Sequence, residues 1–329
     1  MKRMLSGIKP TGQLQLGNYI GALKNFVRYQ DDYEMYVFIA NLHCITVYQD
    51  PEELRKNLRD CAALYLACGL DPNKAVIFQQ SDIRAVAQLG WILSCNSYQG
   101  ELNRMTQYKD KVAKGETSIT VGLYTYPTLM ASDIVIYNSD YVPVGEDQKQ
   151  HVELARDLAI RFNNKYGETF VVPEPVIPEV GAKIMDLQEP TKKMSKSDKS
   201  DKGCIYLLDD PKKARKKIMG AVTDMVGKVN YDRENQPGIS NLLQILSSLS
   251  GEPIDSIVAR MDGQGYGTFK KEVADAVEKE LIKIQAEYQR ILDEGILEEV
   301  LRRGAEIANK VADQKLEEVQ KKIGVEIFK

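Results

Sequence analysis

The feature that most constrains the fold is an alternation of short apolar segments with amphipathic helical segments over the first 80 residues. Apolar runs at 4–8, 35–40 and 75–78 are bounded by Gly, Asp, Asn or Pro, which is typical of buried parallel strands. Helical periodicity fills the intervals: one helix begins near Asn18, and another begins at Asp50–Pro51 and ends at Gly69. This spacing predicts an α/β fold with a Rossmann-like, doubly wound parallel sheet.

The remainder of the chain is predicted to be mostly helical. Helical patterns continue at about 84–95, 126–137 and 148–162, with one extended run at 141–144. A Pro- and Gly-rich stretch at 173–190 predicts a domain boundary. Helical patterns follow at about 211–220, 238–249, 253–261 and 267–323. We therefore expect units at 1–190, 191–290 and 291–329, the last a helix that could fold back onto the first unit.

Composition excludes several classes of protein. The 44 Lys+Arg and 47 Asp+Glu residues give a net charge of −3, so nucleic acid could bind only to local basic patches. No stretch approaches the roughly 20 apolar residues of a membrane span, and we expect no secretory signal. The 5 cysteines contain no C-x-x-C pair, which argues against a disulfide framework or a zinc site. We expect a cytoplasmic protein that binds no membrane.

The first candidate loop, at 6–21, joins the first predicted strand to the first helix, where a doubly wound sheet places a nucleotide. Gly12 and Gly17 allow close approach of a ligand, and Asn18 lies at a helix N-terminus that favours phosphate. The loop is neither G-x-G-x-x-G nor a P-loop, which disfavours dinucleotide binding and P-loop hydrolysis. The alternative is an ordinary Gly-rich turn.

The second candidate loop is Lys192–Ser197, which follows the predicted boundary. Its three lysines alternate with small hydroxyl residues and a methionine, so their ammonium groups could neutralise a departing pyrophosphate. A generic lysine run is more often a solvated surface.

The third candidate loop, Pro143–His151, lies between a predicted strand and a helix. Asp147 could bind ribose hydroxyls and Gln148 an amine, because strand carboxyl ends face the ligand crevice of such sheets. The alternative for Glu146 or Asp147 is to cap the helix.

With the three loops in this order, the chain resembles the class I aminoacyl-tRNA synthetases, and among them the bacterial tryptophanyl subgroup. Lys193–Ser197 spells the K-M-S-K-S signature, and Gln15–Asn18 occupies the place of H-I-G-H. The segments KPTGQLQLGNYIGAL, GELNRMTQYKDK, LMASDI, VPVGEDQKQH and PGISNLL are similar to the same subgroup. The resemblance covers nearly the whole chain. It implies activation of tryptophan by ATP to tryptophanyl-adenylate and pyrophosphate, followed by transfer to the terminal adenosine of tRNA(Trp).

The resemblance also implies which residues form the site. Those expected to bind ATP are Lys9, Pro10, Thr11, Gly17, Asn18, Gly145, Asp147, Ile184, Lys193, Met194, Ser195 and Lys196, with Lys111, Lys193 and Lys196 as the catalytic cations. Those expected to bind tryptophan are Leu5, Gly7, His43, Tyr126, Met130, Asp133, Ile134, Val142, Val144 and Gln148. Within that set, Asp133 would accept the indole N–H, while Tyr126 and Gln148 would receive the ammonium group. Mg²⁺ would accompany ATP without a dedicated protein site, and no tightly bound cofactor is expected.

Three positions depart from the family pattern: Gln15 replaces His or Thr, Leu5 replaces an aromatic residue, and Lys9 replaces Gln. They would either tune affinity and inhibitor sensitivity or be neutral. His151 has no evident partner and is interpreted as structural.

The family further implies a homodimer in which tRNA crosses subunits. Residues 1–190 would hold the catalytic site and the dimer interface, and 191–290 the anticodon-binding domain with the K-M-S-K-S loop at its start. The basic residues Lys212, Lys213, Arg215, Lys216 and Lys217 would meet tRNA phosphates, or form a solvated helix face. The alternatives are a tyrosyl-tRNA synthetase, or a non-catalytic paralogue that binds tRNA or tryptophan.

Overall fold

A single parallel sheet organises the first half of the molecule. The computed structural model describes residues 1–113, 119–177, 183–195 and 201–326, and within them five strands pair in the order β3-β2-β1-β4-β5. These strands are β1 (Arg3–Ile8), β2 (Glu34–Ile39), β3 (Ala75–Gln79), β4 (Tyr141–Pro143) and β5 (Glu174–Val176). All pairings are parallel, and β1 pairs with β2 from Arg3↔Glu34 to Ile8↔Ile39. The Rossmann-like, doubly wound fold is confirmed, and its strand order reverses beside β1, where such sheets bind ligands.

Strand β5 was not predicted. Its residues Glu174–Val176 begin the Pro- and Gly-rich stretch that the sequence indicated as a boundary. The strand is short and lies at the sheet edge, where Pro175 is tolerated because one side of the strand needs no donor.

Helices and short helical turns connect the strands. They are α1 (Leu16–Asn18), the π-helical turn η1 (Tyr19–Leu23), α2 (Lys24–Tyr29), α3 (Asn41–Cys44), α4 (Pro51–Ala67), the 3-10 turn η2 (Gln80–Asp82), α5 (Arg84–Asn96), α6 (Gln99–Leu102), α7 (Thr106–Ala113), α8 (Val121–Val135) and α9 (Glu146–Tyr166). Helix α4 begins where the sequence predicts, and the Asp50 carboxylate caps it by accepting the backbone N–H groups of Glu52 and Glu53. Gly69 follows the helix at φ +108°. Helices α3, α6 and α7 were not predicted.

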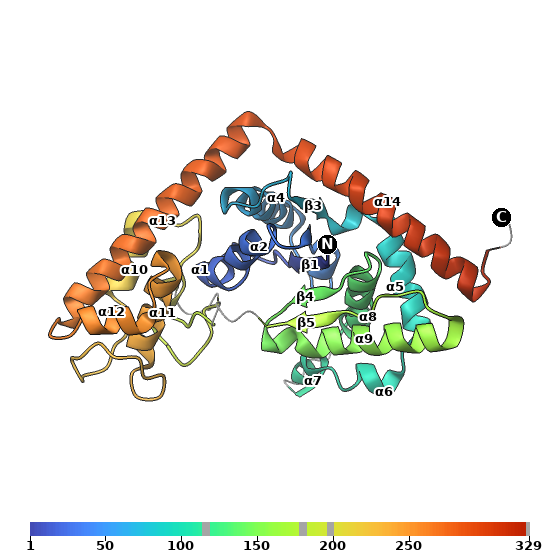
Figure 1. The fold of residues 1–329 in the computed structure, drawn as a ribbon. Helices are drawn as coiled ribbons and strands as arrows, with labels where there is room; N and C mark the ends of the chain where they lie inside the picture. Colours follow the sequence, from blue (N-terminus) through green and yellow to red (C-terminus); the bar gives the residue numbers. More distant parts are fainter. Residues whose placement is uncertain (114–118, 178–182, 196–200, 327–329) are drawn as a thin grey trace.

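The second half is helical, as expected. It comprises the 3-10 turn η3 (Asp201–Gly203), α10 (Pro211–Met219), α11 (Pro237–Ser250), α12 (Ile254–Arg260), α13 (Tyr266–Glu294) and α14 (Leu297–Ile323). The predicted helical region at 267–323 is divided, because Gly295 adopts a left-handed conformation with φ +65° and ends α13. Figure 1 shows α13 and α14 as two arms that meet above the sheet.

The last helix packs back on the sheet. Gly304 of α14 lies so close to β3 that a Cβ placed there would be 1.8 Å from the carbonyl oxygen of Ile77. The apolar residues Ala308, Ala312 and Val319 of α14 are fully buried. The boundaries at 190 and 290 nevertheless remain a prediction.

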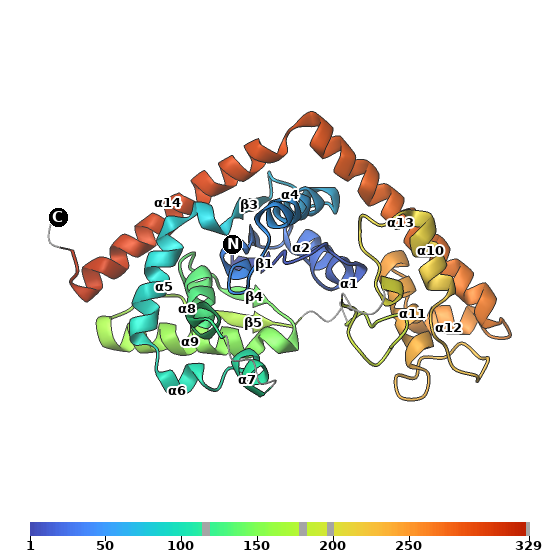
Figure 2. The same ribbon diagram turned by 180° about the vertical axis from the view of Figure 1, so that it is seen from behind.

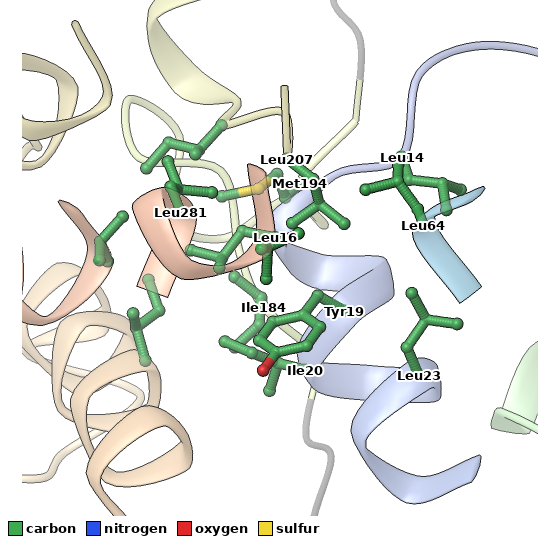
Figure 3. Packing of buried hydrophobic residues seen from close by; sticks show 14 of the residues in the cluster. Leu14, Leu16, Tyr19, Ile20, Leu23, Leu64, Ile184, Met194, Leu207 and Leu281 are labelled. Carbon is green, nitrogen blue, oxygen red and sulfur yellow. The ribbon is translucent and has the colours of Figure 1, made fainter. Parts of the chain in front are cut away.

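Two apolar cores lie on the two faces of the sheet. One core is shared by residues of α5, α8, α9 and α14, and Figure 2 shows where these helices lie. The other joins residues of β1, α1 and α4 to the helical half of the chain, including Leu281 of α13. Figure 3 shows Leu16 and Tyr19 of the α1–η1 segment lying beside Ile184, Met194 and Leu281. The helical half is therefore packed directly against the first loop. No helix of the described residues is long and apolar enough to cross a membrane.

Candidate active site

A cavity of about 1010 Å³ opens where the carboxyl ends of β1 and β4 meet α8, the topological position expected for a ligand. Its opposite wall comes from the helical half, through residues including Arg233, Ser240 and Asn241. The cavity brings together every residue expected to bind tryptophan: Leu5, Gly7, His43, Tyr126, Met130, Asp133, Ile134, Val142, Val144 and Gln148. Their roles remain proposals, but their convergence forms an apolar pocket with a few polar groups.

The carboxylate of Asp133 in the cavity is buried and hydrogen-bonded at both oxygens. Its side chain is 2% exposed, and Oδ2 accepts a hydrogen bond from Nε2 of His43 at 2.8 Å. Nε2 of Gln80 donates to Oδ1 at 2.8 Å and to Oδ2 at 2.9 Å. Burial raises the pKa of Asp133, while the hydrogen bonds from His43 and Gln80 oppose that rise.

Gln80 was not predicted from the sequence. It lies in η2, directly after β3, and is 1% exposed. Its Oε1 accepts the backbone N–H of Leu42 at 3.0 Å, so the amide is fixed between the segment carrying His43 and the carboxylate of Asp133. A buried polar residue at a strand end is the only sequence signal for it.

Tyr126 and His151 form a second polar pair. Tyr126 lies on α8 and lines the cavity, and its hydroxyl is hydrogen-bonded to Nε2 of His151 on α9. No partner of His151 was evident in the sequence, because Tyr126 lies 25 residues earlier and meets it only in the fold. Burial lowers the pKa of His151 to about 4.

Some residues expected to bind ATP line the cavity, namely Lys9, Asn18 and Gly145. Nζ of Lys9 donates to Oγ1 of Thr46 at 3.3 Å, and burial lowers the pKa of the Lys9 ammonium group. Oδ1 of Asn18 accepts the backbone N–H of Gln15 at 3.0 Å, so Asn18 is fixed at the start of the first helical segment. The other described residues of the ATP set lie outside the cavity lining: Pro10, Thr11, Gly17, Asp147, Ile184, Lys193, Met194 and Ser195.

The second loop pairs with residues 184–185 and lies against Gly17 of the first loop. The backbone N–H of Met194 donates to the carbonyl of Ile184 at 2.9 Å, and Met185 forms an antiparallel bridge with Lys193. A Cβ placed on Gly17 would lie 3.7 Å from Cβ of Ile184 and 3.9 Å from Cβ of Met194. Gly17, Ile184 and Met194 thus gather at one point, and Figure 3 shows Ile184 and Met194 near Leu16. The adenine site that the resemblance implies for these residues remains a prediction. Lys196 and the side chain of Lys111 lie outside the described part of the structure.

Asn241 supports this pairing and was not predicted. Its Oδ1 accepts the backbone N–H of Met185 at 2.8 Å, and its Nδ2 donates to the Met185 carbonyl at 2.8 Å. The 4% exposed side chain of Asn241 thereby holds the segment on which Lys193 is paired.

The predicted basic patch on α10 is smaller than expected. Arg215 pairs with Asp275 and Glu278 of α13, while Lys217 pairs with Asp201 and Asp209. These two side chains are occupied by carboxylates of the same chain. The remaining members, Lys212, Lys213 and Lys216, are exposed.

Comparisons with known proteins agree with this geometry. The family model described as tRNA synthetases class I (W and Y) matches residues 1–281. The tryptophan–tRNA ligase of Bacillus anthracis is 53% identical over 325 residues, covering 99% of this chain and 98% of that protein. The Bacillus subtilis enzyme of the same name is 52% identical over 322 residues, covering 98% and 97%.

Solved structures give the same result. Tryptophanyl-tRNA synthetase from Mycoplasma pneumoniae superposes with a TM-score of 0.92 at 39% identity, covering 98% of both chains. The Campylobacter jejuni enzyme, complexed with ADP and tryptophan, gives a TM-score of 0.82 at 39% identity, covering 98% of this chain and 99% of that one. The chain therefore belongs to the class I tRNA synthetases of the W and Y family. Within that family it belongs with the bacterial tryptophan–tRNA ligases.

Proposed function

We propose that this chain activates tryptophan with ATP and transfers the tryptophanyl group to tRNA(Trp). The observation that carries the proposal is the convergence, in one cavity, of all the side chains expected to bind tryptophan around the buried carboxylate of Asp133. In the first step a carboxylate oxygen of tryptophan attacks the α-phosphorus of ATP, and the bond to the leaving pyrophosphate breaks. In the second step the terminal adenosine hydroxyl of tRNA displaces AMP from the adenylate.

Selection of tryptophan would depend on Asp133. The indole N–H would donate to this carboxylate, whose other hydrogen bonds from His43 and Gln80 fix its position. Phenylalanine fills an apolar pocket but offers no donor, which leaves a buried charge short of one hydrogen bond. A synthetase that hydrogen-bonds the phenol hydroxyl of tyrosine rejects phenylalanine for the same physical reason. Tyr126 and Gln148 would receive the ammonium group at the other end of the substrate.

ATP would lie between the first and second loops. Gly17, Ile184 and Met194 would contact the adenine, with Asp147 near the ribose and Asn18 near the phosphates. Lys193 and Lys196, together with Lys111, would neutralise the charge that develops on pyrophosphate, because phosphoryl-centre displacement needs alignment and charge stabilisation more than an acid or base.

Mg²⁺ would enter bound to ATP. Hard divalent cations take oxygen donors such as phosphates, and the nucleotide side of the cavity presents Lys9, Asn18 and Lys183. A cationic and amide lining fits a metal that arrives on the nucleotide. Bound Mg²⁺ would supply charge neutralisation at the phosphates.

A homodimer would form through exposed apolar side chains of the sheet half. Among them, Ile45, Tyr48, Trp91 and Val121 are 65%, 88%, 70% and 77% exposed. Exposed aromatic and aliphatic side chains can mark interaction surfaces, and we assign these to contact with a second copy of the chain. The tRNA would reach the helical half through the exposed lysines of α10. The site of action would be the cytoplasm.

The test is amino-acid-dependent exchange of labelled pyrophosphate into ATP, run separately with tryptophan, tyrosine and phenylalanine. We expect exchange with tryptophan alone. Exchange with tyrosine would contradict the assignment of the pocket, and no exchange in folded protein would favour a non-catalytic paralogue.

Two neighbouring lysines give a matched pair of variants. Lys193→Ala is expected to lower kcat by at least about tenfold. Lys192→Ala should leave kcat within about twofold, because the ammonium group of Lys192 pairs with Glu189, three residues earlier, and Lys192 is not among the residues proposed to bind ATP. Equal effects of the two variants would contradict the role of Lys193.

A further inference from the structure

The imidazole of His151 is a buried polar group that the proposed reaction does not use. It is 0% exposed on α9, and its Nδ1 has no hydrogen-bond partner among the described residues. A buried polar atom without a partner is costly, so a residue that served packing alone would be better apolar. The remaining ring nitrogen, Nε2, is bonded to the hydroxyl of Tyr126.

The position of His151 places it directly behind the polar end of the cavity. Gln148 and His151 are three residues apart on α9, so both side chains point to the same side of that helix, toward α8. Gln148 and Tyr126 line the cavity, whereas His151 does not. The ring centroids of Tyr126 and His151 are 5.3 Å apart, and those of Tyr126 and His43 are 6.1 Å apart with the two rings nearly perpendicular. His151 therefore reaches the ligand space only through the Tyr126 hydroxyl.

The direction of the Tyr126–His151 hydrogen bond determines what Tyr126 offers to a ligand. A phenol has one proton and two lone pairs, and an ammonium group can only donate. If Tyr126 donates its proton to Nε2, the lone pairs of its oxygen are free for ammonium N–H groups, and the chain of hydrogen bonds is mutually polarised. This direction requires a neutral imidazole. Burial keeps the ring neutral at physiological pH by lowering the pKa of His151 to about 4; interaction with His43 acts the same way and Asp147 opposes it.

We propose that His151 is a positioning residue for the ammonium group of tryptophan, because its Nε2 accepts the Tyr126 hydroxyl proton and turns the oxygen lone pairs toward the substrate. The inference rests on the proposed function and deepens it. In this proposal the ammonium group is recognised by residues of two helices. Tyr126 of α8 and Gln148 of α9 contact the substrate, and His151 of α9 acts through its hydrogen bond to Tyr126.

The test compares ligands that differ in one charged group. Dissociation constants of tryptophan, tryptamine and indole-3-propionate are measured by calorimetry on the full chain at neutral pH. Tryptamine keeps the ammonium group and lacks the carboxylate, whereas indole-3-propionate keeps the carboxylate and lacks the ammonium group. His151→Leu is expected to weaken tryptophan and tryptamine by about tenfold and indole-3-propionate by less than about twofold.

A second pair of variants keeps the site polar and protects the test against misfolding. His151→Gln can place an amide oxygen near the position of Nε2, whereas the shorter side chain of His151→Asn cannot reach Tyr126. We expect the Gln variant to retain most of the affinity for the ammonium ligands and the Asn variant to lose it. Leu154→Ala is the packing control, since Leu154 is a buried apolar residue one turn further along α9.

The outcomes separate the two proposals. A loss confined to the ammonium ligands, absent in Leu154→Ala and rescued by Gln, supports the positioning role. Equal losses for all three ligands, or unchanged affinity for tryptophan, would overturn it and leave His151 a structural residue. Failure of the unmodified protein to bind tryptophan would instead overturn the proposed function.

Discussion

Replacing Asp133 by Asn tests how the pocket distinguishes an indole from other apolar rings. The carboxylate presents two acceptor oxygens, which already receive hydrogen bonds from His43 and from the Gln80 amide. Asparagine retains the shape but has one acceptor oxygen and one donor amide. The amide nitrogen of Gln80 contacts both carboxylate oxygens of Asp133. In either orientation of the asparagine, its own amide nitrogen would therefore face the Gln80 nitrogen, and two hydrogen-bond donors would meet. The indole N–H must compete for the single remaining oxygen.

The expected loss follows from that count of donors. Leaving one buried donor unsatisfied costs about 1–3 kcal/mol, which corresponds to a factor of about 5 to 150 in kcat/KM for tryptophan. Phenylalanine brings no donor to the site, and removal of the buried charge relieves part of its penalty. The ratio of kcat/KM for tryptophan to that for phenylalanine should therefore fall by a similar factor.

Pyrophosphate exchange with each amino acid measures this ratio directly, and thermal unfolding of the variant shows whether the fold is intact. Asp133→Glu is a useful control, because it keeps the charge while shifting its position. An unchanged ratio in a folded Asp133→Asn variant would refute the assignment of Asp133 as the acceptor for the indole.

Three further predictions concern stability and assembly. Gly304→Ala should lower the free energy of unfolding, measured in urea, by about 1–3 kcal/mol. The added methyl group would lie 1.8 Å from the carbonyl oxygen of Ile77, so α14 would have to shift away from β3. An unchanged free energy of unfolding would contradict the packing of α14 on β3. The pKa of His151 is about 4 in the folded protein and about 6.5 in the unfolded chain, so between these values the unfolded state binds one more proton. The free energy of unfolding should therefore fall by up to about 3 kcal/mol as the pH drops from 6.5 to 4. His151→Gln should flatten this part of the pH–stability curve, and parallel curves for the variant and the unmodified protein would contradict the prediction. Trp91→Asp should shift the proposed dimer toward monomer in sedimentation equilibrium, since it replaces a large exposed apolar side chain by a charge. An unchanged mass would contradict a dimer interface at Trp91.

The elements that the sequence predicted well are those with strong local patterns. The strands at 4–8, 35–40 and 75–78 are continuous apolar runs, and α4 has an Asp-Pro start and a terminal glycine, so local residues were sufficient. Strand β5 could not be predicted, because its three residues, which include Pro175, carry no strand pattern. Their extended conformation comes from pairing with β4. The division between α13 and α14 escaped because a single glycine interrupts an otherwise continuous helical periodicity.

The candidate site shows the same limit. The resemblance named the side chains that line the cavity, but it did not identify those that hold them. Gln80, His151 and Asn241 act through partners 53, 25 and 56 residues away in the sequence, so only the fold brings them together. Apart from the place of Gln80 directly after a predicted strand, nothing in their local sequence distinguishes them from ordinary polar residues.

The two long helices give the molecule a mechanical property. Helix α13 has 29 residues and, at about 1.5 Å per residue, is about 44 Å long. It packs on α4 of the sheet half and on α10 and α11 of the helical half, and beyond Gly295 the chain continues into α14 on β3. If α13 tilts about its contact with α4, the end of the helix that packs on α10 and α11 moves furthest. A tilt of about 5° would displace its far end by about 4 Å, so a small rotation at the sheet becomes a movement at the helical half that is longer than a hydrogen bond of about 3 Å.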